Sequence, residues 1–210
     1  QSRLLVESEY IGALRRVFGI HSLSPCVECE IAAIKEHLPI SHLMPETRFR
    51  VSVQRVDKSI KASSAEMERE LGAFVVEQTG AKVDLKGFEK ELGVELFSNK
   101  AYVFSERICG PGGLPVGSQG RCTALITDRF SELAALLAMK RGCALDLQGK
   151  SKLLERFEYG FRLGAAEDMS IVVQGRRDVP EMRTHALELD PLVGLTTEEC
   201  EELLQWYTTL

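Results

Sequence analysis

The chain has 210 residues, 44% hydrophobic and 27% charged, which suits one large folded domain or two small ones and excludes a disordered chain. A formal net charge of −5 excludes a protein that is basic over its whole surface, while a local basic face stays compatible with it. No apolar run is long enough to span a bilayer, so we expect no membrane partner. Six cysteines without a signal peptide predict reduced thiols in the cytoplasm.

The first thirty residues predict a helix followed by a strand. Apolar spacing predicts the helix over residues 10–18, ending at Gly19, and strand character over residues 20–31. Cys26 and Cys29 have the spacing of half a zinc knuckle, but no second pair or suitably spaced histidines complete it. The alternative is that both cysteines simply lie in the strand. We favour the strand and expect no metal.

Residues 48–56 predict a strand with two different faces. Its apolar side carries Phe49, Val51 and Val53, and basic residues dominate elsewhere in the segment 46–61. The basic residues of that segment are Arg48, Arg50, Arg55, Lys58 and Lys61, against only Glu46 and Asp57. Such an excess fits a solvated edge strand guarded by cations. It fits a phosphate-binding patch equally well, and the charges alone do not decide between them.

The next elements complete an α+β module. Ser63-x-x-Glu66 has the pattern of a capping box ahead of an apolar helical stripe, which Gly80 ends. Residues 92–97 and 101–106 then predict a hairpin around Ser98-Asn99-Lys100. The order strand, helix, strand, strand is typical of a self-contained α+β unit.

A glycine- and proline-rich stretch over residues 108–117 follows this module. Several glycines in ten residues exclude a regular element and require unusual backbone angles. The stretch is either a phosphate cradle made of backbone amides or a connector between two folded pieces. A bare cluster of glycine and proline favours the connector.

The second half opens like a nucleotide-binding α/β domain. Residues 122–126 predict a buried strand and residues 131–141 a helix, joined by Thr127-Asp128-Arg129-Phe130. This loop has no glycine to bring amides close to a phosphate, and Asp128 places a negative charge where an anion would sit. We therefore expect no ATP site here.

The remaining elements are short. Pieces near 144–147, 152–159 and 170–174 alternate with breaks, and a last helix is capped by Thr196-x-x-Glu199. A complete doubly wound sheet needs longer strands and more helices. The domain is either reduced or lacks segments. Missing segments would be expected near Gly149, Gly164 and Arg177.

Several of these residues together resemble the THUMP domain of the tRNA 4-thiouridine synthetase (thiamine biosynthesis sulfurtransferase) family. The resemblance covers roughly residues 1–142. It is carried by Val17-Phe18-Gly19-Ile20, Ser24-Pro25, the run 49–55, Ser64-Ala65-Glu66, Val83-Asp84-Leu85, the stretch 110–117, Gly120-Arg121 and Met139-Lys140-Arg141-Gly142. It implies a THUMP domain over residues 1–110 with at most a stub of a ferredoxin-like domain, a connector over 111–120 and a PP-loop-type α/β domain over 121–210.

The resemblance also implies a function in tRNA modification. In that family the THUMP domain binds the acceptor end of tRNA, and a PP-loop with the motif Ser-Gly-Gly-x-Asp-Ser uses ATP. Here Thr127-Asp128-Arg129-Phe130-Ser131-Glu132 stands in its place, so the ATP-binding residues do not carry over. The sequence looks like an archaeal-type relative with a decayed PP-loop. We expect no cofactor and assign no catalytic residue and no persulfide-bearing cysteine.

The combined expectation is an α/β protein in which an α+β THUMP module precedes a reduced Rossmann-like, PP-loop-type parallel domain. Its partner would be tRNA, with a separate tRNA-modification enzyme or a second copy of the chain as further partners. The candidate RNA contacts are Arg50, Gln54, Arg55, Lys58, Lys61, Lys86 and Lys90. The rival hypothesis is an ATP-dependent tRNA sulfurtransferase with a divergent nucleotide loop.

Overall fold

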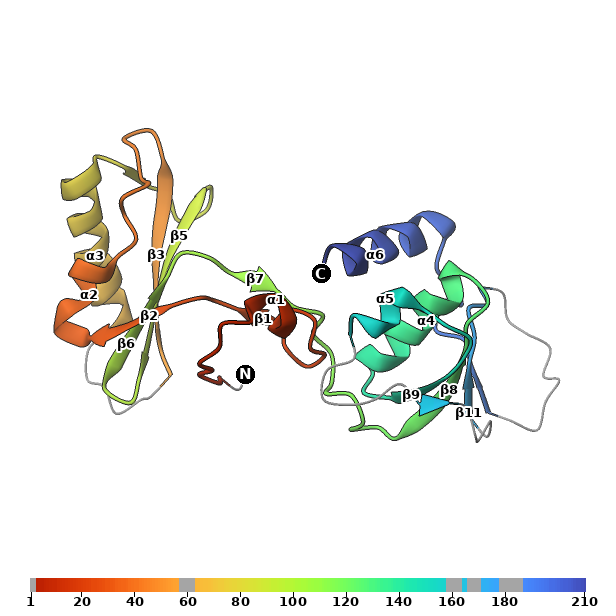
Figure 1. The fold of residues 1–210 in the computed structure, drawn as a ribbon. Helices are drawn as coiled ribbons and strands as arrows, with labels where there is room; N and C mark the ends of the chain where they lie inside the picture. Colours follow the sequence, from red (N-terminus) through yellow and green to blue (C-terminus); the bar gives the residue numbers. More distant parts are fainter. Residues whose placement is uncertain (1–2, 57–62, 158–163, 166–170, 178–186) are drawn as a thin grey trace. The chain divides into compact units, whose positions relative to one another are not determined.

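A computed structural model describes residues 3–56, 63–157, 164–165, 171–177 and 187–210 (Figure 1). The chain forms two compact units, Gln1–Glu7 with Ser24–Arg107, and Ser8–Leu23 with Ile108–Leu210. Each unit encloses its own hydrophobic core. Within the described residues, no helix is long and apolar enough to cross a membrane.

The first unit is a mixed sheet covered by helices on one face (Figure 1). Its elements are β2 (Val27–Glu30), η1 (Ile31–Ala33), α2 (Ile34–His37), β3 (Arg48–Arg55), α3 (Ser64–Thr79), β4 (Lys82–Val83), β5 (Lys90–Phe97) and β6 (Lys100–Phe104). The strand order is β2-β6-β5-β3-β4. β3 runs parallel to β4 and β5, whereas β6 is antiparallel to β5 and β2.

The predicted strand over residues 48–56 is confirmed, with a refinement. Phe49, Val51 and Val53 are buried against the helices, as the alternation requires. β5 flanks its whole length on one side, whereas β4 pairs with only Arg48 and Phe49 on the other. Beyond Phe49 that side has no paired strand among the described residues, so an edge guarded by cations and a phosphate-binding patch both stay predictions.

Helix α3 covers this sheet through Leu71 and Val75, which are buried in the core. Gly80 ends the helix in the left-handed conformation with φ 71°, and its amide donates to the Val76 carbonyl. The predicted capping box is wrong, because the Ser63 side chain makes no capping hydrogen bond. A cap contributes only about 1 kcal/mol, so burial of the apolar stripe is enough to define this helix.

The hairpin of β5 and β6 is confirmed. Ser98 and Asn99 occupy the turn with φ of 51° and 61°, as a two-residue turn between twisted strands requires.

The second unit is a parallel sheet with helices α4, α5 and α6 on one face (Figure 1). Its elements are α1 (Ile11–Leu14), β1 (Ser22–Leu23), β7 (Ile108–Cys109), β8 (Arg121–Leu125), α4 (Arg129–Lys140), β9 (Ala144–Gln148), α5 (Lys152–Glu155), β10 (Gly164–Ala165), β11 (Ile171–Val173), β12 (Leu187–Leu189) and α6 (Thr197–Thr209). Five of these strands form a parallel sheet in the order β10-β9-β8-β11-β12, and β1 pairs antiparallel with β7 in a separate two-stranded sheet. This is the 3-2-1-4-5 order of a Rossmann-like fold, so the predicted α/β class is confirmed.

The N-terminal segment contributes to this second core. The predicted helix over residues 10–18 shortens to Ile11–Leu14, and Phe18 beyond it is buried. The Phe18 ring lies 5.6 Å from that of Phe157 and 6.3 Å from that of Tyr207, measured between centroids. These aromatic contacts pack the segment against Phe157 and against Tyr207 of α6. The predicted capping box of Thr196 and Glu199 at the start of α6 is confirmed.

Candidate functional site

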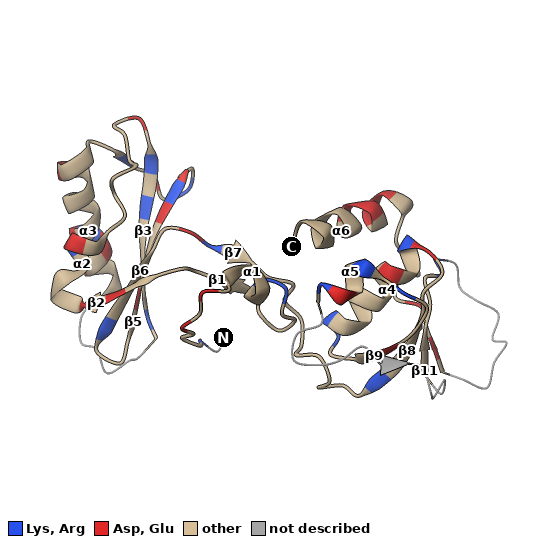
Figure 2. Ribbon diagram, in the orientation of Figure 1, with Lys and Arg blue, Asp and Glu red and all other residues tan. Residues whose placement is uncertain are grey.

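The first candidate site is the face of the first sheet that the helices leave open. Figure 2 shows basic and acidic residues side by side on β3 and β5. Arg50 points to this face and pairs with Glu91 at 2.8 Å, while its guanidinium carbon lies 3.9 Å from the centroid of the Phe88 ring. Gln54 also lies on this face and accepts a hydrogen bond of 2.6 Å from Arg3. Both predicted contacts are therefore held by other side chains of the protein.

Arg55 is exposed at the carboxyl end of β3. Lys58 and Lys61, in the segment that follows β3, lie outside the described residues.

Lys86 and Lys90 are exposed near the opposite end of the sheet. The backbone before β5 turns at Asp84, whose Oδ1 accepts the amides of Lys86 at 3.0 Å and Gly87 at 2.8 Å. These amides, with the nearby Arg48 guanidinium, lower the pKa of the Asp84 carboxyl. The turn thus places both lysines at the amino end of β5.

The predicted cations consequently fall into two groups. Arg55 lies beside Leu96 and Phe49 beside Lys90, so the two groups are separated by six residues of strand, or roughly 20 Å at about 3.3 Å per residue. Arg55 continues the alternation of buried Val51 and Val53, and Lys90 lies beside buried Phe49. Both therefore project from the helix-covered face at its two ends, whereas Arg50 and Gln54 project from the open face.

Residue patterns missed four side chains of this face, namely Arg3, Phe88, Glu91 and Arg107. Arg3 donates to Gln54 and pairs with Glu95 at 3.2 Å, and Arg107 approaches Glu91 at 4.0 Å. Alternation along β5 places Glu91 and Glu95 on one face. Only the register between β3 and β5 shows that Glu91 lies opposite Arg50.

The second candidate site lies at the carboxyl ends of the parallel strands. The strand order reverses between β8 and β11, and ligands of such folds bind in the crevice beyond these two strands. The loops there are Thr127–Asp128 and Gln174–Arg177. The second loop packs against the first turn of α4, since a Cβ added to Gly175 would lie 2.4 Å from the Ser131 amide nitrogen.

The first of these loops is closed by its own side chains. Asp128 Oδ1 accepts the Ser131 amide at 2.8 Å, and Ser131 Oγ accepts the amides of Thr127 and Asp128, both at 2.9 Å. A carboxylate therefore occupies the helix N-terminus where a phosphate would be bound. These residues do not fit a triphosphate.

The glycine-rich stretch also uses its amides within the protein. Its amides donate to backbone carbonyls along both neighbouring segments: Gly110 to His21, Gly112 to Ile20, Leu114 to Lys140, and Gly117 to Gly142. A Cβ on Gly113 would lie 2.1 Å from the Lys140 carbonyl oxygen. The glycines thus permit close backbone packing, and these four amides are engaged by carbonyls and not directed at an anion.

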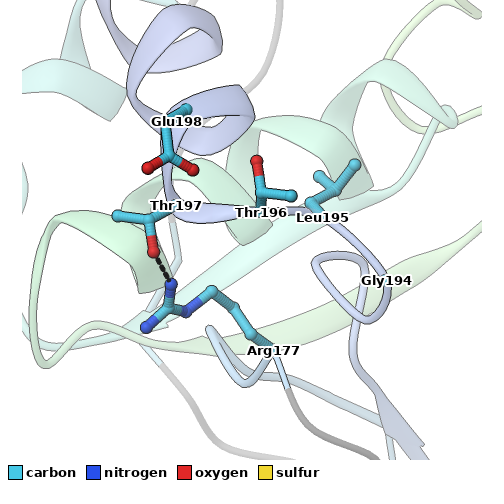
Figure 3. Close-up of a pocket in the computed structure, with 6 residues that line it drawn as sticks. All are labelled: Arg177, Gly194, Leu195, Thr196, Thr197 and Glu198. Carbon is cyan, nitrogen blue, oxygen red and sulfur yellow. Dashed lines mark hydrogen bonds between the residues drawn. The ribbon is translucent and has the colours of Figure 1, made fainter.

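An open pocket lies beside the N-terminus of α6, lined by Arg177, Gly194, Leu195, Thr196, Thr197 and Glu198 (Figure 3). The Arg177 guanidinium donates to Thr197 Oγ1, and Thr196 Oγ1 accepts the Glu199 amide. The charges of Arg177 and Glu198 offset each other and the cap occupies an amide, so the lining has no excess of positive charge for an anion.

The cysteines show no metal arrangement. Cys26 is exposed and Cys29 is buried, and the described residues contain no cluster of three candidate metal ligands. Burial, followed by the neighbouring Cys143, raises the pKa of Cys122 to about 12, so this thiol is a poor nucleophile.

Residues 30–106 match the THUMP domain family. A protein of Thermococcus kodakarensis named probable tRNA sulfurtransferase is 32% identical over 189 residues, covering 79% of this chain and 49% of that protein. A protein of the same name from Methanocaldococcus jannaschii is 36% identical over 140 residues, covering 62% of this chain and 37% of that protein. The chain thus spans half or less of these relatives.

Two solved structures share the fold. The crystal structure of PH1313 from Pyrococcus horikoshii matches with a TM-score of 0.76 at 28% identity, covering 94% of this chain and 80% of that chain. A 4-thiouridine synthetase crystallised with RNA and ATP matches with a TM-score of 0.53 at 24% identity, covering 67% of this chain and 40% of that chain. Residues 30–106 therefore form a THUMP domain, and the chain is similar to the proteins named tRNA sulfurtransferase.

Proposed function

We propose that this protein binds tRNA through its first unit and recognises the acceptor end by its shape. The THUMP match at residues 30–106 carries this proposal, because it spans all the helices of the first unit and β3 to β6. The names of the related proteins, which are tRNA sulfurtransferases, support it further.

The proposed phosphate contacts are the cations at the two ends of the sheet. Lys86 and Lys90 supply one end and Arg55 the other, with Lys58 and Lys61 in the segment after β3. Each lysine or arginine that neutralises a phosphate releases a counterion, so affinity should fall as salt rises. Arg50 and Gln54 would contact RNA from the open face of the sheet, which is not the face from which Arg55 and Lys90 project, with their intramolecular partners kept.

The proposal for the second unit is a fold without ATP-pyrophosphatase activity. Support comes from the loop of β8, where the Asp128 carboxylate accepts the amide that a phosphate would need. We keep the expected domain boundaries, 1–110, 111–120 and 121–210, as predictions. A cytoplasmic location, a separate modification enzyme and a homodimer likewise remain predictions.

The second candidate function is ATP-dependent tRNA sulfur transfer. It is favoured by the Rossmann-like strand order and by the names of the relatives. Release of pyrophosphate that requires both ATP and tRNA would establish it. Absence of that release from a protein that binds tRNA would leave RNA binding as the function of this chain.

The experiment is a binding titration of tRNA with and without its single-stranded 3′ end over a salt series. We expect salt-dependent binding that weakens when the 3′ end is removed. Changing Lys86 and Lys90 together to Ala should make the slope of log affinity against log salt less steep by up to about two, because each lysine would neutralise one phosphate. The matched control is Lys152→Ala in α5 of the second unit. Equal binding of both RNAs would refute recognition of the acceptor end.

A further inference from the structure

We propose that Glu68 of α3 closes the open edge of β3 and thereby prevents a second copy of this chain from pairing with that strand. The inference concerns the assembly of the protein and does not rest on the proposed binding of tRNA.

The direction of the backbone groups along β3 defines this edge. The carbonyls of Thr47 and Phe49 accept the amides of Lys82 and Asp84, both at 2.9 Å, on the side of β4. Backbone groups of a strand alternate between its two sides, so every second residue beyond Phe49 also points to the side of β4. Among the described residues, no strand pairs with β3 there. The residues that point to this open edge are Val51, Val53 and Arg55.

A side chain takes the place of a strand at the middle of the edge. Glu68 Oε1 accepts the Val53 amide at 2.9 Å. Glu68 lies three residues before buried Leu71, at the margin of the face that α3 packs on the sheet, so its side chain reaches the edge. An unpaired amide on a sheet edge is a template for another strand. The carboxylate therefore satisfies this amide and stands where the carbonyl of an incoming strand would be.

A second copy of β3 would fit this edge in antiparallel orientation. A twofold axis at Val53 would place that residue opposite its own counterpart and Val51 opposite Arg55. All three direct their backbone groups to the edge, as the hydrogen-bonded pairs of an antiparallel ladder require. On the open face Ser52 would lie opposite Gln54, so no two charged side chains would oppose each other over residues 51–55. The central pair of this ladder needs the amide that the carboxylate now holds.

The test changes the reach and the acceptor of this side chain. Glu68→Ala removes the acceptor, and Glu68→Asp keeps the charge on a side chain one methylene shorter, so neither should hold the Val53 amide. Glu68→Gln keeps an acceptor oxygen at the same position. The matched control is Glu77→Ala, an exposed glutamate further along α3. Circular dichroism checks that each variant folds, which we expect because residue 68 lies outside the hydrophobic core.

Amide hydrogen exchange, followed by NMR at low protein concentration, reports on the hydrogen bond itself. Exchange at Val53 should be about tenfold faster or more in Glu68→Ala and Glu68→Asp, as expected for the loss of one hydrogen bond to a charged acceptor. Exchange should keep the wild-type rate in Glu68→Gln and Glu77→Ala.

Light scattering after size-exclusion chromatography, over a series of protein concentrations, reports on assembly. Glu68→Ala and Glu68→Asp should form a species of twice the wild-type mass as concentration rises. Protection of the Val53 amide should return in that species, because the amide is then bonded to the other copy. Glu68→Gln and Glu77→Ala should keep the wild-type mass throughout.

Three outcomes would overturn the proposal. The first is a wild-type mass for both Glu68→Ala and Glu68→Asp at every concentration, and the second is unchanged exchange at Val53. The third is association without renewed protection of Val53, which would place the contact elsewhere. If Glu68→Ala does not fold, Glu68→Asp decides the question, because it keeps a negative charge in the first half of α3. None of these measurements involves RNA, so they hold whether or not the protein binds tRNA.

Discussion

At the scale of single residues, the thiols differ sharply in their expected reactivity. Cys26 and Cys109 are exposed, whereas Cys122 is only 5% exposed and its pKa is raised to about 12 by burial and by Cys143. At pH 8 we expect an alkylating reagent to modify Cys26 and Cys109 in the folded protein and to leave Cys122 unmodified until the chain unfolds. Peptide mass spectrometry after timed alkylation measures this order. Early modification of Cys122 would contradict its burial.

The same thiol gives stability a pH dependence with a defined sign. A thiol with a raised pKa stays protonated in the folded protein while it ionises in the unfolded chain. Its stabilising contribution is therefore complete below about pH 9 and is lost as pH rises towards about 12. The free energy of unfolding should fall less steeply above pH 9 in Cys122→Ala than in wild type, as denaturant titrations at several pH values would show.

At the scale of elements, the glycine-rich stretch is a packed segment with position-specific requirements. Gly113 and Gly117 both have positive φ, at 77° and 88°. A Cβ would meet the Lys140 carbonyl at Gly113, but nothing within 4 Å at Gly117. Gly113→Ala should therefore cost roughly 3 kcal/mol or more, and Gly117→Ala only the left-handed backbone strain of about 1 kcal/mol. Thermal unfolding of the two variants tests this difference, and equal losses would show that backbone strain alone matters.

Local patterns predicted those parts of the fold that local physics determines. Alternation identified β3, turn residues identified the β5–β6 hairpin, and the Thr196 capping box identified the start of α6. The missing glycines and the charge of Asp128 predict a loop that binds no phosphate, and this stays a prediction. In the structure the carboxylate itself caps α4.

Long-range relations lay beyond those patterns. The parallel register that places Glu91 beside Arg50 depends on a crossover through α3 and β4. The residues next to Arg50 in the sequence therefore give no sign of its ion pair with Glu91. The sequence also does not show which unit the segment 8–23 packs against, because its apolar residues could be buried in either core. Only packing against residues more than a hundred positions away assigns Phe18 to the second core.

At the scale of the whole molecule, the chain leaves the second unit after β1, forms the first unit, and returns to the second unit at β7. β1 and β7 pair with each other. Leu23 lies opposite Ile108, and Ser22 opposite Cys109. Replacing Ser24–Arg107 by an Asn-Gly turn should thus give a second unit that folds alone, because a two-residue turn can close an antiparallel pair. Circular dichroism and thermal unfolding would report a cooperative transition. A molten fragment without one would show that the second unit needs the first to fold.

This continuity has a consequence for folding on the ribosome. The segment 8–23 is synthesised early, but its strand partner begins only at Ile108, after the 84 residues from Ser24 to Arg107. At about 5–20 residues per second, that delay lasts roughly 4 to 17 seconds. Throughout it, the Phe18 side chain has none of its later aromatic neighbours, while the inserted unit can fold first. The nascent chain therefore carries an exposed apolar segment, which a holdase chaperone would be expected to bind until the second unit is complete.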